Sequence, residues 1–206
     1  MGVKTKLYSI VMLGTNCYLV WDENSKEAML IDPGAYEFVI EQDINDNGLE
    51  LKYIFLTHGH YDHIEGVDGF ILAFPSAILA AHVGDRSIMN GLEPEMILNE
   101  GEILNLGELS FNVITTPGHT EGGLCLYIAE SDVSLTDQSF SGMLFSGDTL
   151  FRMSVGRTDL GGGDFDTLRS SIQEKLLILP DDTLVLPGHM GATTIGNEKQ
   201  YNTLIK

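Results

Sequence analysis

Apolar residues gather along this chain in short runs that polar turns separate, which is typical of buried β-strands in a globular protein. The polar turn Asp22–Lys26 joins two such runs into a predicted hairpin, and Gly107 does the same for a later pair. We therefore expect strands at Leu7–Met12, Asn16–Trp21, Ala28–Ile31, Lys52–Leu56, Ala77–Ala81, Ile103–Leu106, Leu109–Thr115, Leu124–Ile128, Met143–Phe145 and Leu184–Leu186.

Helical spacing of apolar residues appears between several of these strands. The clearest case follows Asp164, which can cap a helix, and its apolar positions recur at Leu168, Ile172, Leu176 and Leu179, just before Pro180. We predict helices at Tyr36–Ile44, from about Ile64 to Phe74, at Gly84–Asn90, from Asp164 to about Leu179, and after Gly196. The polar stretches Glu93–Glu102 and Glu130–Ser141 are predicted to be exposed loops, the second of them mobile. The alternation of strands and helices indicates an α/β protein.

One stretch concentrates residues that bind metals. The segment Thr57–His63 contains three of the six histidines of the chain together with Asp62, directly after an apolar strand and before a helix. Alternate residues of an extended segment point the same way, so His58 and His60 can share one ion, while Asp62 and His63 can face a second. Imidazole and carboxylate suit zinc, iron or manganese. A polar loop with ordinary hydrogen bonds would suit a lone histidine better than this cluster.

Three later turns repeat one layout, in which an apolar strand is followed by a glycine and then by a residue of a metal-binding type. Any one of them alone would be typical of a structural turn, but together with the first cluster they predict one constellation. They are Pro117-Gly118-His119, Ser146-Gly147-Asp148 and Pro187-Gly188-His189. The remaining histidine, His82, lies outside this layout and is predicted to be structural.

Composition narrows the class of protein. The 206 residues, 43% of them hydrophobic, fit one globular domain with a substantial core. Thirty acidic residues against 11 basic ones give a formal net charge of −19. A surface this acidic repels phosphate backbones, which argues against nucleic acid as a partner. Bound metal would cancel part of the negative charge.

The two cysteines and the N-terminus bear on the location of the protein. Cys17 and Cys125 both lie within apolar runs, so we expect buried free thiols rather than a disulfide, which fits a reducing cytoplasm. The apolar run after Lys4 and Lys6 is too short for the core of a signal peptide, and no stretch is long enough to span a membrane. We therefore expect a cytoplasmic protein without a membrane partner.

At this point the sequence resembles the metallo-β-lactamase superfamily, and in particular its small glyoxalase II-like hydrolases. The resemblance extends over nearly the whole chain, from Asn16-Cys17-Tyr18 and Ile31-Asp32-Pro33-Gly34 to Thr193-Thr194-Ile195-Gly196. It implies a four-layer αββα sandwich with the site along one edge. We expect a single domain over residues 1–206, because only 17 residues follow His189, where larger glyoxalase II enzymes carry a helical domain that helps bind glutathione.

The resemblance also implies a set of ligands for two divalent metal ions. It places His58, His60 and His119 on one metal and Asp62, His63 and His189 on the other, with Asp148 bridging them. Zinc is the preferred metal, with iron and manganese as alternatives. Two such ions would hold a bridging hydroxide as the nucleophile, which Asp62 could orient or deprotonate.

The resemblance suggests a small thioester as the substrate, with hydroxyacyl-glutathione as the leading candidate. Arg157 follows Asp148 at the position where larger glyoxalase II enzymes place a basic residue that meets glutathione, and Arg152 is a less favoured alternative. The rival is a persulfide dioxygenase with one iron held by His58, His119 and Asp148. Lactone hydrolysis and a non-catalytic metal-stabilised binding module remain further alternatives, and the sequence leaves the oligomeric state open.

Overall fold

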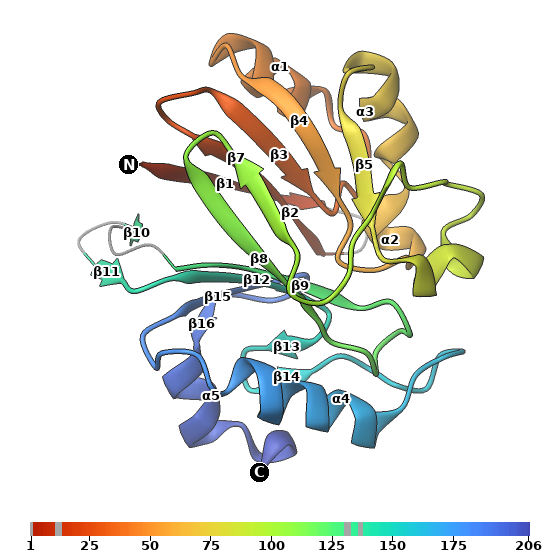
Figure 1. Ribbon diagram of the computed structural model, residues 1–206. Coiled ribbons are helices and arrows are strands. Elements are labelled where there is room, and N and C mark those ends of the chain that lie inside the picture. Colours follow the sequence, from red (N-terminus) through yellow and green to blue (C-terminus); the bar gives the residue numbers. More distant parts are fainter. Residues whose placement is uncertain (1, 11–13, 130–132, 136–137) are drawn as a thin grey trace.

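The computed structural model describes residues 2–10, 14–129, 133–135 and 138–206. Two six-stranded mixed sheets face each other, and helices cover the outer face of each (Figure 1). The first sheet has the order β1-β2-β3-β4-β5-β6, with strands at Val3–Ile10, Thr15–Asp22, Glu27–Ile31, Glu50–Phe55, Ile78–Ala81 and Met96–Ile97. The second has the order β16-β15-β12-β9-β8-β7, with strands at Thr193–Thr194, Leu184–Pro187, Met143–Gly147, Leu124–Ile128, Leu109–Thr115 and Ile103–Leu106.

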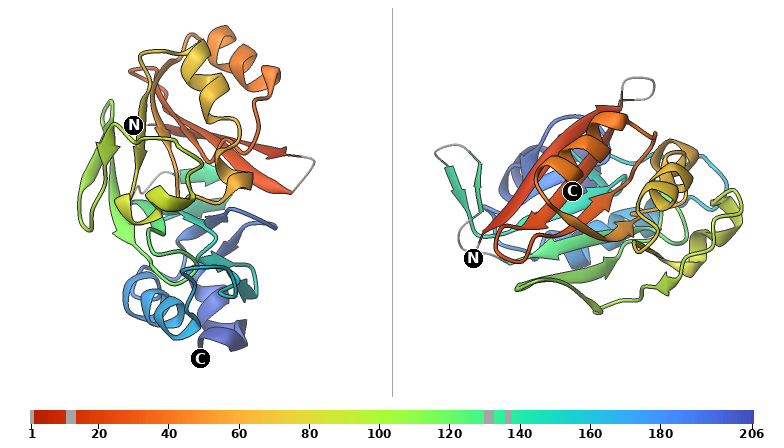
Figure 2. Two further views of the ribbon diagram at one scale, coloured as in Figure 1. Left: turned by 90° about the vertical axis from the view of Figure 1, so that its right-hand side faces the viewer. Right: turned by 90° about the horizontal axis from the view of Figure 1, so that it is seen from above.

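The helices form the two outer layers (Figure 2). Residues of the first sheet pack against the helices that follow its strands, α1 (Phe38–Asp46), α2 (Tyr61–Ile64) and α3 (Val67–Ala73). Residues of the second sheet pack against α4 (Phe165–Ser171) and α5 (Ile195–Tyr201). This arrangement is the predicted αββα sandwich.

Three buried apolar clusters separate these four layers. The largest lies between the two sheets and includes the fully buried rings of Phe55, Phe111 and Phe145. Alternate residues of a strand point to opposite faces, so both faces of each sheet are buried and the central strands are apolar almost throughout. Burial of each such aromatic side chain contributes about 1.5–3 kcal/mol, which holds the strand ends that carry the site in register.

The predicted strands are confirmed with small shifts in their bounds. The first runs from Val3 to Ile10 rather than from Leu7, and the predicted residues 11–12 lie outside the described residues. The predicted helix at Tyr36–Ile44 begins two residues later, at Phe38. Cys17 and Cys125 are buried free thiols, as expected.

Two predicted loops are wrong in part. The stretch Glu93–Glu102 contains the short strand β6 and the buried Leu98, because β6 pairs in parallel with β5 and closes the edge of the first sheet. Within the stretch Glu130–Ser141, the described residues form a two-stranded ribbon of β10 (Val133–Leu135) and β11 (Gln138–Phe140). Residues 130–132 and 136–137 of that prediction lie outside the described part of the chain.

The helix predicted from Ile64 to Phe74 is divided into α2 and α3 at Gly66. The main chain of Gly66 packs directly on Ala35, where an added Cβ would clash, and its N–H donates to Pro33 O over 2.8 Å. This contact turns the chain, so that α2 is a single short helix beside the site. The helix after Asp164 also departs from regularity, because residues Ile172–Leu176 form a π-helical segment, η2, directly after α4.

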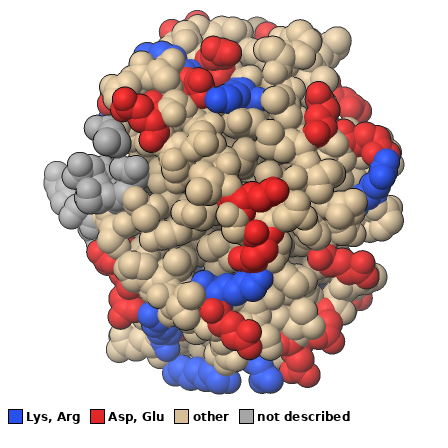
Figure 3. Space-filling model, viewed as in Figure 1, with Lys and Arg blue, Asp and Glu red and all other residues tan. Residues whose placement is uncertain are grey.

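Charged residues are spread over the surface rather than gathered in one patch on the face that Figure 3 shows. Several basic residues are paired with acidic ones, for example Arg86 with Glu93 and Lys175 with Glu100. Among the described residues, no helix combines the length and the apolar character that crossing a bilayer requires.

Candidate metal centre

The candidate ligands come together because strands of both sheets end at one edge of the sandwich. His58 and His60 follow β4, and α2 then presents Asp62 and His63 on its first turn. Asp148 follows β12, and His189 follows β15, which runs parallel to β12. The turn between β8 and β9 supplies the last ligand, His119. The four predicted segments therefore converge, although they are distant in the sequence.

The first group consists of three histidines. His119 Nε2 lies 3.3 Å from His58 Nε2 and 2.9 Å from His60 Nδ1. One ligand atom from each side chain lies within 4.8 Å of the others, so the three can hold a single ion. His58 and His119 are buried and His60 is half-buried, and this group therefore lies at the inner end of the site.

The second group consists of Asp62, His63 and His189, whose ligand atoms also lie within 4.8 Å of one another. His189 Nε2 is 3.3 Å from both His63 Nε2 and Asp62 Oδ2. Asp148 touches both groups: its Oδ2 lies 3.6 Å from His119 Nε2 and 3.5 Å from His189 Nε2, and its Oδ1 lies 3.4 Å from His63 Nε2. This position between the groups is the one predicted for a bridging carboxylate.

The chemistry of the donor set fits divalent metal ions. Imidazole nitrogens that share one ion at ~2.0–2.1 Å in a tetrahedral site lie about 3.3 Å apart, close to the separations within both groups. The Nδ1 atoms of His58 and His119 donate hydrogen bonds elsewhere, so in neutral rings their Nε2 atoms face each other unprotonated and repel unless a cation lies between them. Among the residues that the structure describes, the buried Asp148 Oδ1 has no hydrogen-bond partner, which is costly for a carboxylate oxygen unless a cation satisfies it.

Hydrogen bonds on the far side of each ring fix which nitrogen faces the centre. His58 Nδ1 donates to Thr57 Oγ1 over 3.0 Å, and that hydroxyl donates to Asp32 Oδ2 over 2.6 Å. Asp32 Oδ2 also accepts from His63 Nδ1 over 2.9 Å. Such outer partners hold the ring orientation and the tautomer that a metal ligand needs.

The rings of His119 and His189 are oriented by main-chain carbonyl groups instead. His119 Nδ1 donates to Arg157 O over 2.6 Å, and His189 Nδ1 donates to Gly14 O over 3.2 Å. The Gly156–Asp159 loop therefore supports the centre through its backbone, a contribution that the sequence analysis did not assign to it.

Asp32 and Asp85 are the main functional residues that the sequence analysis missed. Asp85 is buried and accepts hydrogen bonds from Gly59 N (2.9 Å), Thr120 Oγ1 (2.7 Å) and Gly122 N (2.6 Å). It thus ties the loop of His58 and His60 to the turn of His119. Asp32 has a φ of +51°, in the left-handed region, where the chain turns sharply at the end of a strand. An acidic residue at a strand end was the one signal in the sequence that could have indicated its role.

Charge separates the two groups. Burial, followed by the neighbouring histidines, lowers the pKa of His58 well below its usual range, and burial also lowers the pKa of His60. Burial lowers the pKa of His63 too, but the carboxylates of Asp148 and Asp32 outweigh it and raise that pKa to about 9. Burial raises the pKa of Asp62, but the hydrogen bond with His189 and the charge of His63 outweigh it and lower that pKa to about 2.

The centre opens into a cleft of about 550 Å³. Its lining combines ligands with apolar side chains, and consists of His60, Tyr61, Asp62, His119, Asp148, Phe151, Ser154, Val155, Arg157, Leu160, His189 and Met190.

The two candidate arginines lie in different places. Arg157 reaches the rim of the cleft, where it is 63% exposed and forms a bidentate ion pair with Asp159 at 2.6 and 2.8 Å. Arg152 lines a separate hollow beside Met153 and Tyr201. His82 caps the 3-10 helix η1 (Val83–Ile88) by accepting from Gly84 N over 3.1 Å, so it has the structural role predicted for it.

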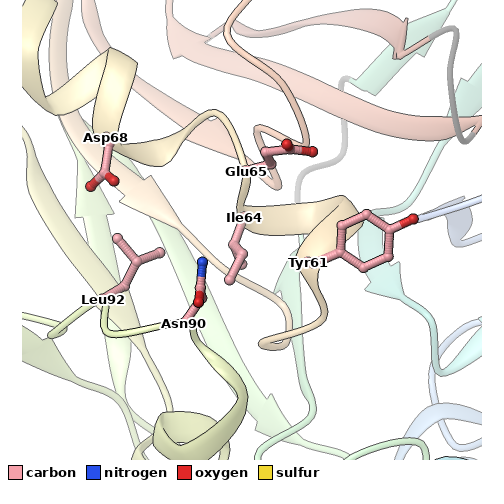
Figure 4. Close-up of a pocket in the computed structure, with 6 residues that line it drawn as sticks. All are labelled: Tyr61, Ile64, Glu65, Asp68, Asn90 and Leu92. Atoms are coloured by element: carbon pink, nitrogen blue, oxygen red, sulfur yellow. The ribbon is translucent and has the colours of Figure 1, made fainter.

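A smaller hollow of about 180 Å³ lies beside the cleft and shares Tyr61 with it (Figure 4). In Figure 4, Ile64, Asn90 and Leu92 gather at this hollow, while the ring of Tyr61 lies at its edge and points away. None of the candidate ligands lines this hollow, so the chemistry belongs to the larger cleft.

Comparison with known proteins gives a consistent family. The family model described as the metallo-β-lactamase superfamily matches residues 11–189. The hydroxyacylglutathione hydrolase GloC of Haemophilus influenzae is 36% identical, over 92% of this chain and 92% of its own. The mitochondrial persulfide dioxygenase ETHE1 of Mus musculus is 33% identical, over 91% of this chain and 70% of its own.

Two solved structures add to this. The BLEG-1 B3 metallo-β-lactamase superposes with a TM-score of 0.86 at 32% identity, over 98% of this chain and 100% of its own. The protein TTHA1623, in a di-iron-bound form, superposes with a TM-score of 0.80 at 32% identity, over 96% of this chain and 98% of its own. Proteins similar to this chain are thus named for several different activities.

Proposed function

The chain belongs to the metallo-β-lactamase superfamily, and from this membership we propose that it is a binuclear metal-dependent hydrolase that cleaves a small thioester. Hydroxyacyl-glutathione is the leading candidate substrate. The observation that carries the proposal is the pair of three-ligand groups that Asp148 joins at the floor of an open cleft. The sequence identity between this chain and a hydroxyacylglutathione hydrolase supports a thioester as the substrate class.

We assign His58, His60 and His119 to one divalent ion, Asp62, His63 and His189 to the other, and Asp148 to both. When bound, the two ions supply Lewis acidity and lower the pKa of water toward ~7, which provides hydroxide at neutral pH. Zinc is our first assignment, and iron and manganese suit the same donors. The di-iron form of TTHA1623 supports a site for two ions in this fold.

The residues of the chain orient the reactants. Asp62 has a pKa of about 2, so its carboxylate stays ionised at neutral pH and can accept a hydrogen bond from an attacking water or hydroxide. A carboxylate this acidic is a weak base, which favours orientation over proton removal. His58 and His63 are buried, and the cleft gives the substrate access to the other ligands, which line it.

Arg157 is our candidate for substrate binding at the rim. Its guanidinium can bind a carboxylate of the thiol portion, in competition with Asp159, which holds it in the described structure. Arg152 provides a matched control, because it lines a different hollow. Arg157→Ala should raise the KM for lactoyl-glutathione, whereas Arg152→Ala should leave it unchanged.

A second candidate function is persulfide oxidation, which the identity to the mouse persulfide dioxygenase favours. It would use one iron held by His58, His119 and Asp148, and would leave His63 and His189 without a metal. The stoichiometry of metal separates it from the first proposal.

The deciding experiment combines elemental analysis of protein purified without added metal with a thiol-release assay on lactoyl-glutathione. About two metals per chain together with thiol release would support the proposal. One iron per chain, no thiol release, and oxygen consumption with glutathione persulfide would replace it with the second function. Two metals without release of thiol from any thioester would retain a hydrolase and direct the assay to lactones.

A further inference from the structure

Glu198, on α5, is a fully buried carboxylate outside the metal centre. It has no ion-pair partner among the described residues, and hydrogen bonds satisfy both of its oxygens. Its Oε1 accepts from Thr193 Oγ1 over 2.7 Å, and its Oε2 accepts from Met153 N and from Asn202 Nδ2, both over 2.9 Å. A buried carboxylate is costly unless several donors satisfy it, so a residue of this kind needs a reason.

The three donors belong to different segments of the chain. Met153 lies in the turn of the hairpin formed by β13 (Leu150–Phe151) and β14 (Ser154–Val155). Asn202 follows α5 and also donates to Ser154 O over 3.1 Å. Glu198 and Asn202 therefore hold the hairpin at two of its main-chain groups, the N–H of Met153 and the carbonyl of Ser154.

The hairpin needs this support. Each of its strands has two residues, and an isolated ribbon that short is not stable in water. Met153 also has a φ of +60°, a left-handed conformation that is unfavourable for a residue with a side chain. The bond from Met153 N to the Glu198 carboxylate stabilises this conformation.

The front of the hairpin faces the metal centre. Phe151 and Val155 line the cleft, and the ring of Phe151 stands edge-on to that of His189, with 6.1 Å between their centroids. Leu160 and Met190 extend this apolar lining, and both are partly exposed to solvent. A substrate that reaches the ligands must therefore pass an apolar wall.

We propose that the β13–β14 hairpin binds an apolar group next to the bond that is cleaved, and that Glu198 is the positioning residue that holds this hairpin in place. The proposal rests on the proposed thioester hydrolysis, which supplies the bond and the assay. Glu198 acts through the hairpin and does not touch the substrate.

The test uses two series of thioesters, one lengthened by single methylenes in the acyl group and the other in the thiol. Transfer of a methylene to an apolar wall should raise kcat/KM about three- to fourfold per step in at least one series with the wild-type enzyme. In Glu198→Ala we expect this gain to fall to about onefold per step, while the protein still binds two metals. Loss of the increase in kcat/KM per methylene would indicate that the hairpin has moved from its position beside the metal centre.

Two variants serve as controls. Glu198→Gln should keep the gain, because its amide oxygen can accept from Met153 N and its amide N–H can donate to the Thr193 hydroxyl. Thr193→Val removes only the bond to Oε1, on the side away from the hairpin, and should keep the gain as well. If Glu198→Ala does not fold, Asn202→Ala removes the second anchor and should lower the gain.

The outcomes are distinct. The same gain per methylene in Glu198→Ala as in the wild type would overturn the positioning role, and no gain in either series with the wild type would overturn the apolar wall. If the wild type hydrolyses no thioester, the proposed function fails, and hydrogen–deuterium exchange of residues 150–156 decides the positioning role. Faster exchange of residues 150–156 in Glu198→Ala but not in the control variants, with residues 57–63 unchanged, would support the positioning role. Unchanged exchange of residues 150–156 would overturn it.

Discussion

The two groups of candidate ligands differ in charge, although they share Asp148 and lie side by side. The first contains three imidazoles, and burial keeps the pKa values of His58 and His60 low, so their rings stay neutral. In the second, the carboxylates around His63 raise its pKa to about 9, so in the metal-free protein its ring carries a proton at neutral pH. The first group is ready to accept an ion, whereas the second must first release a proton.

This difference shows how the fold accommodates closely spaced ionisable side chains before metal binds. The positive charge on His63 offsets the negative charges of Asp32 and Asp148, which stabilises the buried cluster before any ion binds. The neutral rings of His58 and His60 need no such offset. We therefore expect the first group to fill with metal before the second.

Replacement of the shared carboxylate should have the largest effect, because it breaks both groups at once. In Asp148→Asn the bridging charge is lost, and we expect hydrolysis to fall by more than 100-fold, beyond the 10–100-fold typical of outer partners. Elemental analysis should show fewer than two metals per chain. Full metal content with wild-type activity would exclude Asp148 as the bridge.

Replacement of the outer carboxylates should separate the groups. Asp32→Asn removes the carboxylate that His63 contacts directly, and should lower the metal affinity of the second group about 10–100-fold. Its effect on the first group should be smaller, because it reaches His58 only through Thr57. Asp85→Asn weakens the contacts that join the loops of the first group, so its effect should fall on the other ion. Competition with a chromophoric chelator measures both affinities, and equal losses at both ions in both variants would contradict the division into groups.

The candidate ligands could be predicted because each follows an apolar strand. The strands that precede the ligands end at one edge of the sandwich, so His119, Asp148 and His189 could be grouped with His58 without any knowledge of distances. The buried strand β15 is a clear example, since Leu184–Pro187 is apolar throughout and His189 lies two residues beyond it. The pattern of apolar strands followed by metal-binding residue types thus predicted both the layers of the fold and the candidate ligands.

The supporting residues could not be predicted in the same way, because their roles depend on contacts between distant segments. Asp85 lies in a short helix whose pattern resembles that of an exposed segment, yet it joins two ligand loops. Glu198 lies on a short terminal helix, and its burial depends on Met153 and Asn202. The break at Gly66 likewise follows from a backbone contact with Ala35 rather than from local preference.

The dependence of metal binding on pH should distinguish the groups further. Below pH 9 an ion must displace the proton of His63, so the apparent affinity of the second group should fall about tenfold per pH unit between pH 9 and 7. The affinity of the first group should change less in this range, because burial lowers the pKa values of His58 and His60. Calorimetry in buffers of different ionisation enthalpy should detect more protons released at pH 7 with the second ion than with the first.

The same raised pKa makes a prediction about the metal-free protein. A histidine with a pKa raised above its usual value of ~6.5 stabilises the folded state below that pH, and the contribution is lost as the pH rises through about 9. Thermal unfolding of the metal-free chain should therefore show a lower Tm at pH 9.5 than at pH 6.5. In Asp32→Asn this difference should be smaller, and a wild-type Tm that rises over the range would contradict the charge assigned to His63.

The smallest effect is expected at His82, the histidine outside both groups. His82→Ala removes the acceptor for Gly84 N at the start of η1, which should lower the free energy of unfolding by about 0.5–2 kcal/mol. His82→Asn keeps an acceptor at this cap and should restore most of the stability. Metal content should stay at two per chain in both variants, because no ligand atom of either group depends on this ring. A loss of metal in His82→Ala that also occurs in His82→Asn would show that this histidine is a metal ligand and not a structural residue.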